Sequence, residues 1–343
     1  MLRRSAGIVG VLLVALVGAG VSDAVETQTG PRLALTWLNE SRSELVTVDP
    51  SGSDQHLVVD GHGPVQPFAI SPSSWSADGN RLAFIGIPSE GKFRFDIYTR
   101  AVDGGDVLWV PGTRGGTQPL LSPDGHTLAF TRFKPGKEGK KQTGPPESAV
   151  WLADLAGGVV RRITPRMPRV SDTGSSFSPD GSTLLLTRTV GTGAPAAVSI
   201  DLSRGRATTI AERAADPVYS PDGSRIAFGR VPWRAVRAGN QSKHLFTDLY
   251  VMKADGSAVK RLTKTGKVAE LRPSWDPSGQ RLAYLESEES VGEGDLPLFF
   301  DGSLGEINAD GTCRTAIPTT PEPRIAGAVW RPGAGREAGP IAC

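Results

Sequence analysis

Three polar residues occupy matching positions in the chain and could bind or transform a small ligand. Gln118, Asp216 and Arg272 each stand three residues before the Leu or aromatic residue that opens a repeated motif. Glu270 and Arg324 lie near the same register. A carboxylate and a guanidinium in one pocket could serve as acid, base or charge stabiliser, with His244 as a further candidate. The same groups could instead hold a ligand or a partner's chain end, or pair with one another.

Two other patterns resemble reactive sites, and we interpret both as structural. Asp-Thr-Gly at 172–174 matches the tripeptide of aspartic proteases, but it occurs once and falls in a loop leading to a strand. The histidines are scattered without ligand spacing, so the sequence predicts no metal site, no catalytic set and no cofactor. They are His56, His62, His126 and His244.

A short motif recurs and identifies the elements that must position these residues. Copies of aromatic-Ser-Pro-Asp-Gly begin at residues 75, 121, 177, 219 and 275, some with substitutions, and a sixth begins at Trp330 and stops. Ser, Pro, Asp and Gly in this order favour a type I turn followed by a left-handed glycine. We therefore interpret Asp124, Asp180 and Asp222 as turn residues.

The strands around each turn predict an all-β fold. After each turn, large apolar residues alternate mostly with alanine, as expected for a strand covered on both faces. Two more strands follow, so each repeat gives four antiparallel strands, which is the blade of a β-propeller. The segment from Arg32 supplies three strands without a first, and residues 328–333 supply the missing one. The sequence thus predicts a six-bladed β-propeller over residues 32–333, closed by strands from both termini.

The repeat resembles that of TolB-like six-bladed propellers, and also that of the propeller in prolyl-oligopeptidase-type peptidases. The resemblance covers residues 31–333 and implies the propeller fold. It also implies export to the cell envelope and a propeller that holds a partner protein. TolB carries an additional N-terminal domain, whereas only residues 25–31 separate the leader from the first strand here. The Gly-x-Ser-x-Gly elbow of the peptidases does not occur in the sequence.

The first 24 residues read as a secretory signal peptide. Arg3 and Arg4 precede an uncharged apolar run from Ile8 to Val21, and Ser22 and Ala24 fit a cleavage site. An uncleaved anchor is the alternative, although the run is short for a membrane span. We expect residues 25–31 to be a linker, residues 334–343 a C-terminal tail, and the protein to be secreted or in the cell envelope.

The net charge and the cysteine content limit the classes of partner that the protein could bind and the compartment in which it could be found. The formal net charge is +2, which gives no electrostatic case for nucleic-acid binding. Cys313 and Cys343 are the two cysteines, and an even pair in an exported chain predicts a disulfide that returns the C-terminus to the body. We expect a monomer without a stable membrane span once the signal is removed.

Long insertions are expected on the face opposite the Ser-Pro-Asp-Gly turns. They span residues 133–147, 231–246 and 286–303, and the first two are basic while the third is acidic. Aromatic residues beside charged segments are typical of contact surfaces, although they could instead pack on the blades below. These aromatics are Trp233, Phe246, Phe299 and Phe300.

Two functions follow from these observations. The favoured one is a non-enzymatic propeller that binds a protein or cell-wall component through the face with the insertions. The alternative is a lyase or hydrolase with a small-ligand site at the channel mouth.

Overall fold

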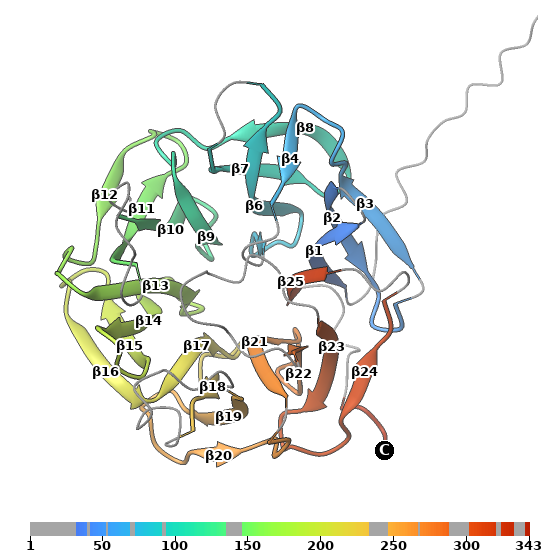
Figure 1. Ribbon diagram of the computed structural model, residues 1–343, viewed down its shortest axis with the longest axis vertical. Helices are drawn as coiled ribbons and strands as arrows, with labels where there is room; N and C mark the ends of the chain where they lie inside the picture. The colour runs from blue at the N-terminus through green and yellow to red at the C-terminus, as the bar shows by residue number, and fades with distance from the viewer. Residues whose placement is uncertain are drawn as a thin grey trace, which may run out of the picture.

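The computed structural model is all-β in its described part and arranges its sheets around a central axis (Figure 1). Among the residues described, no helix is long and apolar enough to cross a membrane. The expected signal peptide and linker lie outside these residues. The described residues are 32–39, 42–52, 54–68, 73–90, 94–134, 146–232, 246–266, 268–287, 302–319, 324–332 and 340–343.

Two of the five sheets contain four consecutive strands in chain order, and one sheet combines segments from both ends of the chain. That sheet has the order β25 (Arg324–Trp330), β1 (Leu33–Asn39), β2 (Arg42–Val48) and β3 (Gln55–Val59). β25 and β1 are antiparallel, with Trp330 opposite Leu33. Residues near the two ends of the described chain therefore share one sheet.

The next sheet has a divided first strand. β4 (Val65–Pro67) and β5 (Ser74–Trp75) both pair with β6 (Arg81–Pro88), which is followed by β7 (Asp96–Ala101) and β8 (Gly104–Trp109). Two later sheets are regular. They are β17 (Ala214–Tyr219), β18 (Arg225–Arg230), β19 (Asp248–Lys253), β20 (Lys260–Arg261), and β21 (Ala269–Trp275), β22 (Arg281–Ser287), β23 (Gly302–Asn308), β24 (Thr315–Ile317).

An eight-stranded sheet joins two sets of four strands. The sets meet through a single parallel pair, Ser148 and Ser171, whose hydroxyl oxygens lie 2.9 Å apart. The first set is β9 (Gly116–Leu121), β10 (Thr127–Phe133), β11 (Ser148–Asp154), β12 (Val160–Arg162), and the second is β13 (Val170–Phe177), β14 (Thr183–Val190), β15 (Ala196–Asp201), β16 (Ala207–Glu212).

The second strand of the repeat is buried on both faces, as the sequence predicts. Its large residues Phe84, Phe130, Phe228 and Tyr284 are at most 1% exposed. The alanines beside them, at 83, 129, 227 and 283, are fully buried. Small side chains let one sheet approach the next closely, so the core consists of apolar layers between neighbouring sheets.

The repeated turns have the predicted geometry. In "SPDG" at 220–223, the Gly223 N–H donates to the Ser220 carbonyl at 2.8 Å, and Gly223 is left-handed with φ 72°. The Asp222 carboxylate accepts from the Ser220 hydroxyl at 2.5 Å and from the Ser224 N–H at 3.0 Å. The structural interpretation of the turn aspartates is therefore confirmed.

The divergent copy of the turn motif at 276–279 has its two polar residues in exchanged positions but keeps the hydrogen bond between their side chains. Here Asp276 is first and Ser278 third, and the Ser278 hydroxyl donates to the Asp276 carboxylate at 2.5 Å. Asp276 also accepts from the Gln280 and Arg281 N–H groups, both at 2.8 Å. The turn therefore requires one Ser–Asp pair rather than a fixed order.

Hydrogen bonds between neighbouring sheets connect their innermost strands β5, β9, β13, β17, β21 and β25. We call the following five bonds the cross-sheet belt: Leu121 N–H to Ser74 Oγ (2.9 Å), Tyr219 N–H to Ser176 Oγ (3.3 Å), Trp330 N–H to Ser274 Oγ (3.0 Å), Trp75 Nε1–H to the Val329 carbonyl (2.9 Å) and Trp275 Nε1–H to the Val218 carbonyl (3.2 Å). The first residue of the motif, through its main-chain N–H or its indole N–H, thus joins every neighbouring pair of these inner strands except β9 and β13.

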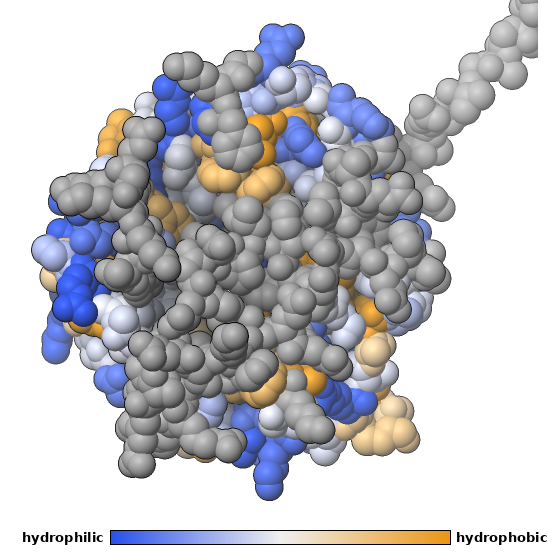
Figure 2. Space-filling model, in the orientation of Figure 1, coloured by the Kyte–Doolittle hydropathy of each residue, from blue (hydrophilic) through white to orange (hydrophobic). Residues whose placement is uncertain are grey.

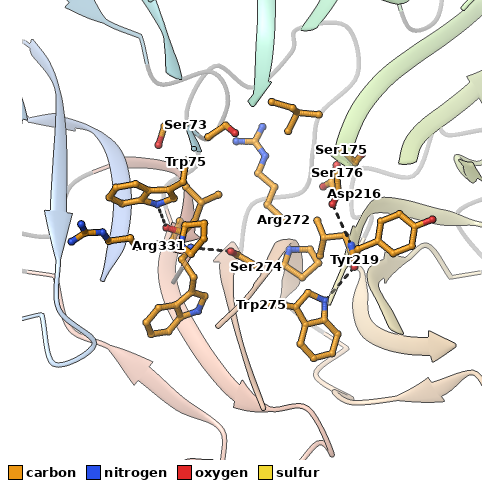
Figure 3. Close-up of a pocket in the computed structure, with 18 of the residues that line it drawn as sticks. Ser73, Trp75, Ser175, Ser176, Asp216, Tyr219, Arg272, Ser274, Trp275 and Arg331 are labelled. Carbon is orange, nitrogen blue, oxygen red and sulfur yellow. Dashed lines mark hydrogen bonds between the residues drawn. The ribbon is translucent and has the colours of Figure 1, made fainter. Parts of the chain in front are cut away.

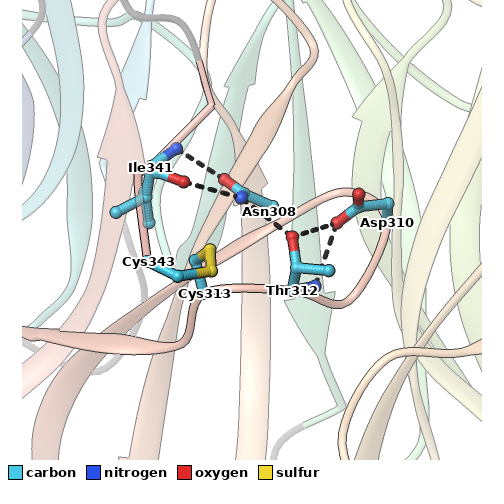
Figure 4. The surroundings of a disulfide bond; sticks show 6 residues. All are labelled: Asn308, Asp310, Thr312, Cys313, Ile341 and Cys343. Atoms are coloured by element: carbon cyan, nitrogen blue, oxygen red, sulfur yellow. Dashed lines mark hydrogen bonds between the residues drawn. A yellow bond between two sulfur atoms is a disulfide. The ribbon is translucent and has the colours of Figure 1, made fainter.

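The C-terminus is fixed near the end of β23 (Figure 4). Cys313 and Cys343 form a disulfide with Cα atoms 5.0 Å apart. The Asn308 side chain donates to the Ile341 carbonyl at 3.0 Å and accepts from the Ile341 N–H at 2.7 Å. The last described residues are therefore held by covalent and polar contacts together.

We predict that Asp222→Asn lowers stability at pH 7 and that most of this loss disappears as the pH falls to 2. The Ser220 hydroxyl bond holds the pKa of Asp222 down at about 2, against an ordinary 3.8. Stabilisation from a lowered carboxyl pKa is complete above the ordinary value and is lost as the pH falls through the folded value. The loss at pH 7 should stay below about 1 kcal/mol because solvent screens an exposed carboxylate. Urea unfolding at several pH values measures it, with exposed Asp106→Asn as a control that should change little. An equal deficit at every pH would contradict the prediction.

Replacing Cys343 with serine should destabilise the protein by about 3.6 kcal/mol, because the disulfide no longer reduces the conformational entropy of the unfolded chain. The bridged cysteines are 30 residues apart. Denaturant unfolding of Cys343→Ser measures the loss. A reducing agent should lower the stability of the wild type to that of Cys343→Ser and should leave the stability of the variant unchanged. A variant as stable as the oxidised wild type would refute this role.

Trp275→Phe should cost about 1 kcal/mol because it keeps the ring but removes the bond to the Val218 carbonyl. Trp109→Phe is the matched control, since Trp109 is 50% exposed on β8 and contributes nothing to the belt. Thermal unfolding of both variants gives the comparison. Equal losses would mean that ring size, and not the indole N–H, is responsible.

Candidate functional site

The innermost strands carry β-bulges at matching positions. Pairing shifts register around Gln118 in β9, Asp216 in β17 and Arg272 in β21. These residues have φ of 53°, 51° and 52°, which side chains other than glycine rarely adopt. They therefore lie within the inner strands. Strained residues of this kind concentrate at functional sites.

Threonines support the Asp216 bulge and a further bulge in β13, where pairing shifts between Gly174 and Ser176. The Asp216 N–H donates to the Thr187 hydroxyl at 2.9 Å, and the Gly174 N–H donates to the Thr131 hydroxyl at 3.2 Å. Both threonines lie near the end of a second strand of the repeat, in β14 and β10. Each of these two bulges is thus held by the preceding set of four strands.

A central cavity of 370 Å³ is lined by the inner strands and the turns that follow them (Figure 3). Gln118, Asp216 and Arg272 all contribute to its wall. Prolines and apolar side chains form much of the remaining wall, among them Leu120 and Val218. Small-ligand sites in proteins combine such apolar walls with a few placed polar groups.

Asp216 and Arg272 come from adjacent inner strands and interact. The Asp216 carboxylate accepts a hydrogen bond from the Arg272 main-chain N–H and is attracted electrostatically by the Arg272 guanidinium. Burial raises the pKa of Asp216, and this contact opposes the rise. Burial lowers the pKa of Arg272, against the attraction of Asp216. The Arg272 side chain extends into the middle of the cavity (Figure 3).

Glu270 lies apart from these residues, buried between sheets. Its carboxylate accepts from the Thr263 hydroxyl and from the Leu249 N–H at 3.3 Å. Arg314 approaches it to 3.4 Å. Burial raises the pKa of Glu270, while these partners lower it. Glu270 thus joins β21 to its neighbours, and the cavity wall does not include it.

The Asp-Thr-Gly aspartate is also paired. Asp172 is fully buried within β13, not in a loop, and the Arg188 guanidinium binds both of its oxygens at 2.6 and 2.8 Å. This bidentate contact raises the pKa of Arg188. Asp172 is thus paired with a guanidinium and not with a second carboxyl, so the tripeptide serves the pairing of β13 and β14.

The remaining predicted site residues fall largely outside the described structure. Trp233, Phe299, Phe300 and His244 are not among the described residues, and the side chain of Arg324, at the start of β25, is not described either. Phe246 lies half-buried two residues before β19. Within the residues described, no group of three or more acidic, histidine or cysteine side chains could hold a metal ion.

Basic residues gather at the strand ends opposite the Ser-Pro-Asp-Gly turns. We call these six residues the arginine rim: Arg114, Arg132, Arg166, Arg169, Arg213 and Arg230. Arg132 stacks on Trp151 at 4.8 Å, and Arg230 on Tyr250 at 4.6 Å. Burial lowers the pKa of Arg132, and repulsion from Arg166 lowers it further. Aromatic stacking thus holds two of the six arginines, and each of these two is repelled by another rim arginine, Arg132 by Arg166 and Arg230 by Arg213.

Hydrophilic side chains cover much of the periphery of the molecule (Figure 2). Arg114, Arg166 and Arg169 of the rim are exposed, and the other three are half-buried. Exposed arginines held in one region favour contact with a negatively charged surface.

Sequence reasoning missed the serines of the inner strands. Ser73 and Ser175 line the cavity, while Ser74, Ser176 and Ser274 accept the belt bonds. A signal was present, because serine directly precedes the motif aromatic at 74, 176 and 274. No comparable pattern in the sequence indicated the strained bulges.

Comparisons with known proteins agree with this architecture. No protein-family model matches the chain. The "Uncharacterized peptidase YuxL" of Bacillus subtilis is 29% identical over 131 residues, which are 36% of this chain and 18% of that protein. The Tol-Pal system protein TolB of Anaeromyxobacter dehalogenans is 47% identical over 58 residues, which are 17% of this chain and 11% of that protein. The matches thus span less than a fifth of either curated relative.

Solved structures resemble most of the chain. TolB from Acinetobacter baumannii superimposes with a TM-score of 0.64 at 23% identity, covering 88% of this chain and 67% of that one. A protein from Agrobacterium tumefaciens described as TolB gives 0.59 at 19%, covering 84% and 89%. Oligogalacturonate lyase from Vibrio parahaemolyticus gives 0.50 at 14%, covering 85% and 75%. These likenesses identify the fold of this chain as that of a TolB-like β-propeller.

Proposed function

We propose that the protein is a non-enzymatic binding module of the cell envelope or secreted space that holds a partner protein with an acidic surface. The arginine rim is the observation that carries this proposal. Several guanidinium groups on one face would attract such a partner from a distance and then pair with its carboxylates.

We further propose the architecture in which this module works. The eight-stranded sheet counts as two blades joined by one parallel pair, which gives six blades with β25-β1-β2-β3 as the last. This last blade would close the ring with strands from both ends. The domain limits would be a signal peptide at 1–24, a linker at 25–31, the propeller at 32–333 and a tail at 334–343.

The contacts of the rim support binding over a merely solvated surface. Arg132 and Arg230 each lie over two aromatic rings, with Phe130 and Phe228 at 4.9 and 5.1 Å. Stacked guanidinium groups lose little further freedom when they bind a carboxylate. Arginine is also enriched among the residues that dominate protein interfaces.

The Tol-Pal relative and the lyase neighbour bear on different parts of the proposal. A relative named as a protein of the Tol-Pal system favours a role in contact with other proteins. The lyase neighbour is the reason to test the alternative, a lyase or hydrolase site in the cavity. Because the Asp216 carboxylate is held by the Arg272 main-chain N–H, we favour binding over catalysis for these residues as well.

Charge reversal at the rim tests this function. The immobilised protein should retain a specific partner protein from an envelope extract. Arg114→Glu combined with Arg169→Glu should weaken retention by about tenfold or more, as expected for the loss of interface charge pairs. Raising the salt concentration should weaken wild-type retention in the same direction.

The matched control reverses two charges on the opposite side. Arg204 and Arg206 are exposed between β15 and β16, and Arg204→Glu with Arg206→Glu should leave retention unchanged. Equal losses in both double variants would show that only net charge matters. Retention that neither the rim variant nor salt affects would overturn the rim as the binding surface.

A further inference from the structure

We propose that the central cavity binds a free apolar α-amino acid as its zwitterion, with the carboxylate on Arg272 and the ammonium on Asp216 and Gln118. This site is separate from the arginine rim and goes beyond the binding of a partner protein. It rests on buried polar atoms, charge balance and the shape of the wall.

Three buried polar atoms in the cavity wall have no hydrogen-bond partner within the described part of the chain. They are Ser73 Oγ, Ser175 Oγ and Gln118 Oε1. The Ser73 residue is only 3% exposed. A buried polar group without a partner is costly, and such groups are few in native proteins. A ligand that supplies both donors and acceptors would satisfy all three.

The cationic end of Arg272 marks the position of the ligand's carboxylate. In Figure 3 the Arg272 guanidinium lies between Ser73 and Ser175, and all three residues line the cavity. A guanidinium and two hydroxyl groups can together donate to both oxygens of a carboxylate.

Acceptors on the adjoining strands mark the position of the ammonium. Gln118 Oε1 can only accept, and the Asp216 carboxylate has more acceptor sites than its bond to the Arg272 N–H uses. An ammonium group has three donors to offer. A neutral hydroxyl would satisfy Gln118 but would leave the charge of Asp216 without a counterpart on the ligand.

Charge balance favours a zwitterion over a simple anion. The cavity already contains one arginine and one aspartate that interact. A zwitterion adds no net charge to this buried site, whereas a plain carboxylate would leave it negative and would pay the cost of burying that charge.

The wall restricts the ligand's side chain and size. Leu120, Val218 and Pro273 line the cavity, so an apolar side chain would be buried favourably. The volume of 370 Å³ is at the small end of ligand pockets, which span about 300–1,000 Å³. The bulges hold Gln118, Asp216 and Arg272 in place before the ligand arrives, which reduces the entropy lost on binding.

Calorimetric titration of the purified protein with L-leucine tests the site. We expect saturable binding with one ligand per chain. N-acetyl-L-leucine lacks the ammonium and L-leucinamide lacks the carboxylate, so each should bind about tenfold more weakly or worse, as expected when a charged contact is lost. Either derivative binding as well as leucine would overturn the proposal. So would failure of leucine and of the other standard amino acids to bind.

Variants of the protein assign the contacts. Arg272→Gln should abolish detectable binding, and Ser73→Ala should weaken it by several-fold while leaving the inner-strand charges intact. Gln280→Ala, outside the cavity, is the matched control and should bind like the wild type. Circular dichroism verifies folding, and Ser73→Ala remains decisive if Arg272→Gln fails to fold. Unchanged affinity in Ser73→Ala together with Arg272→Gln would refute the assignment.

The outcome is distinguishable from that of the rim experiment. The rim variants change no residue of the cavity, so they should bind leucine like the wild type. Loss of partner retention alone would leave the amino-acid site standing, and loss of leucine binding alone would leave the partner-binding proposal standing.

Discussion

No sheet of this protein buries its apolar surface by itself, because both faces of its second strand are apolar. Phe84, Phe130, Phe228 and Tyr284 are buried on these strands, and the alanines between them are fully enclosed. Each sheet must therefore lie between two others. Arranging such sheets around an axis satisfies this requirement for all of them, and the central space is a consequence of that arrangement.

The belt of hydrogen bonds determines what this central space can become. Ser74, Ser176 and Ser274 and the indoles of Trp75 and Trp275 fix the inner strands at one level. Just beyond that level the strands bulge, and the bulges turn side chains toward the axis. The stability of the sheet arrangement and the chemistry of the cavity thus depend on adjacent residues of the same strands.

Much of the fold could be predicted from the sequence because the turns are local. A Ser–Asp pair with glycine at the left-handed position determines the hairpin wherever it occurs, and even the exchanged copy at 276–279 retains it. The matching positions of Gln118, Asp216 and Arg272 in the repeat distinguish them in the sequence, and all three line the cavity. Glu270 is close to Arg272 in sequence but does not line the cavity.

The rest depends on interactions between distant residues. Successive residues of a strand point to opposite sides, so the two-residue step from Glu270 to Arg272 would normally keep one side, and the bulge at Arg272 breaks that rule. The partner of Glu270 is Arg314, which follows β23 in the chain. No local sequence pattern predicts this pair. Likewise the pairing of Asp172 with Arg188 requires the register of β13 on β14, which repeat spacing alone does not give.

The disulfide changes how the protein would respond to mechanical load. β25 lies inside the covalent loop between Cys313 and Cys343. Tension applied at the C-terminus therefore passes through the sulfur atoms to residue 313 and does not reach β25 or its pairing with β1. Pulling at the N-terminus would instead act directly on β1, and would peel it from β25 starting at the pair formed by Leu33 and Trp330. The two ends of the chain share one sheet, but a pulling force applied at one end loads different strands from a force applied at the other.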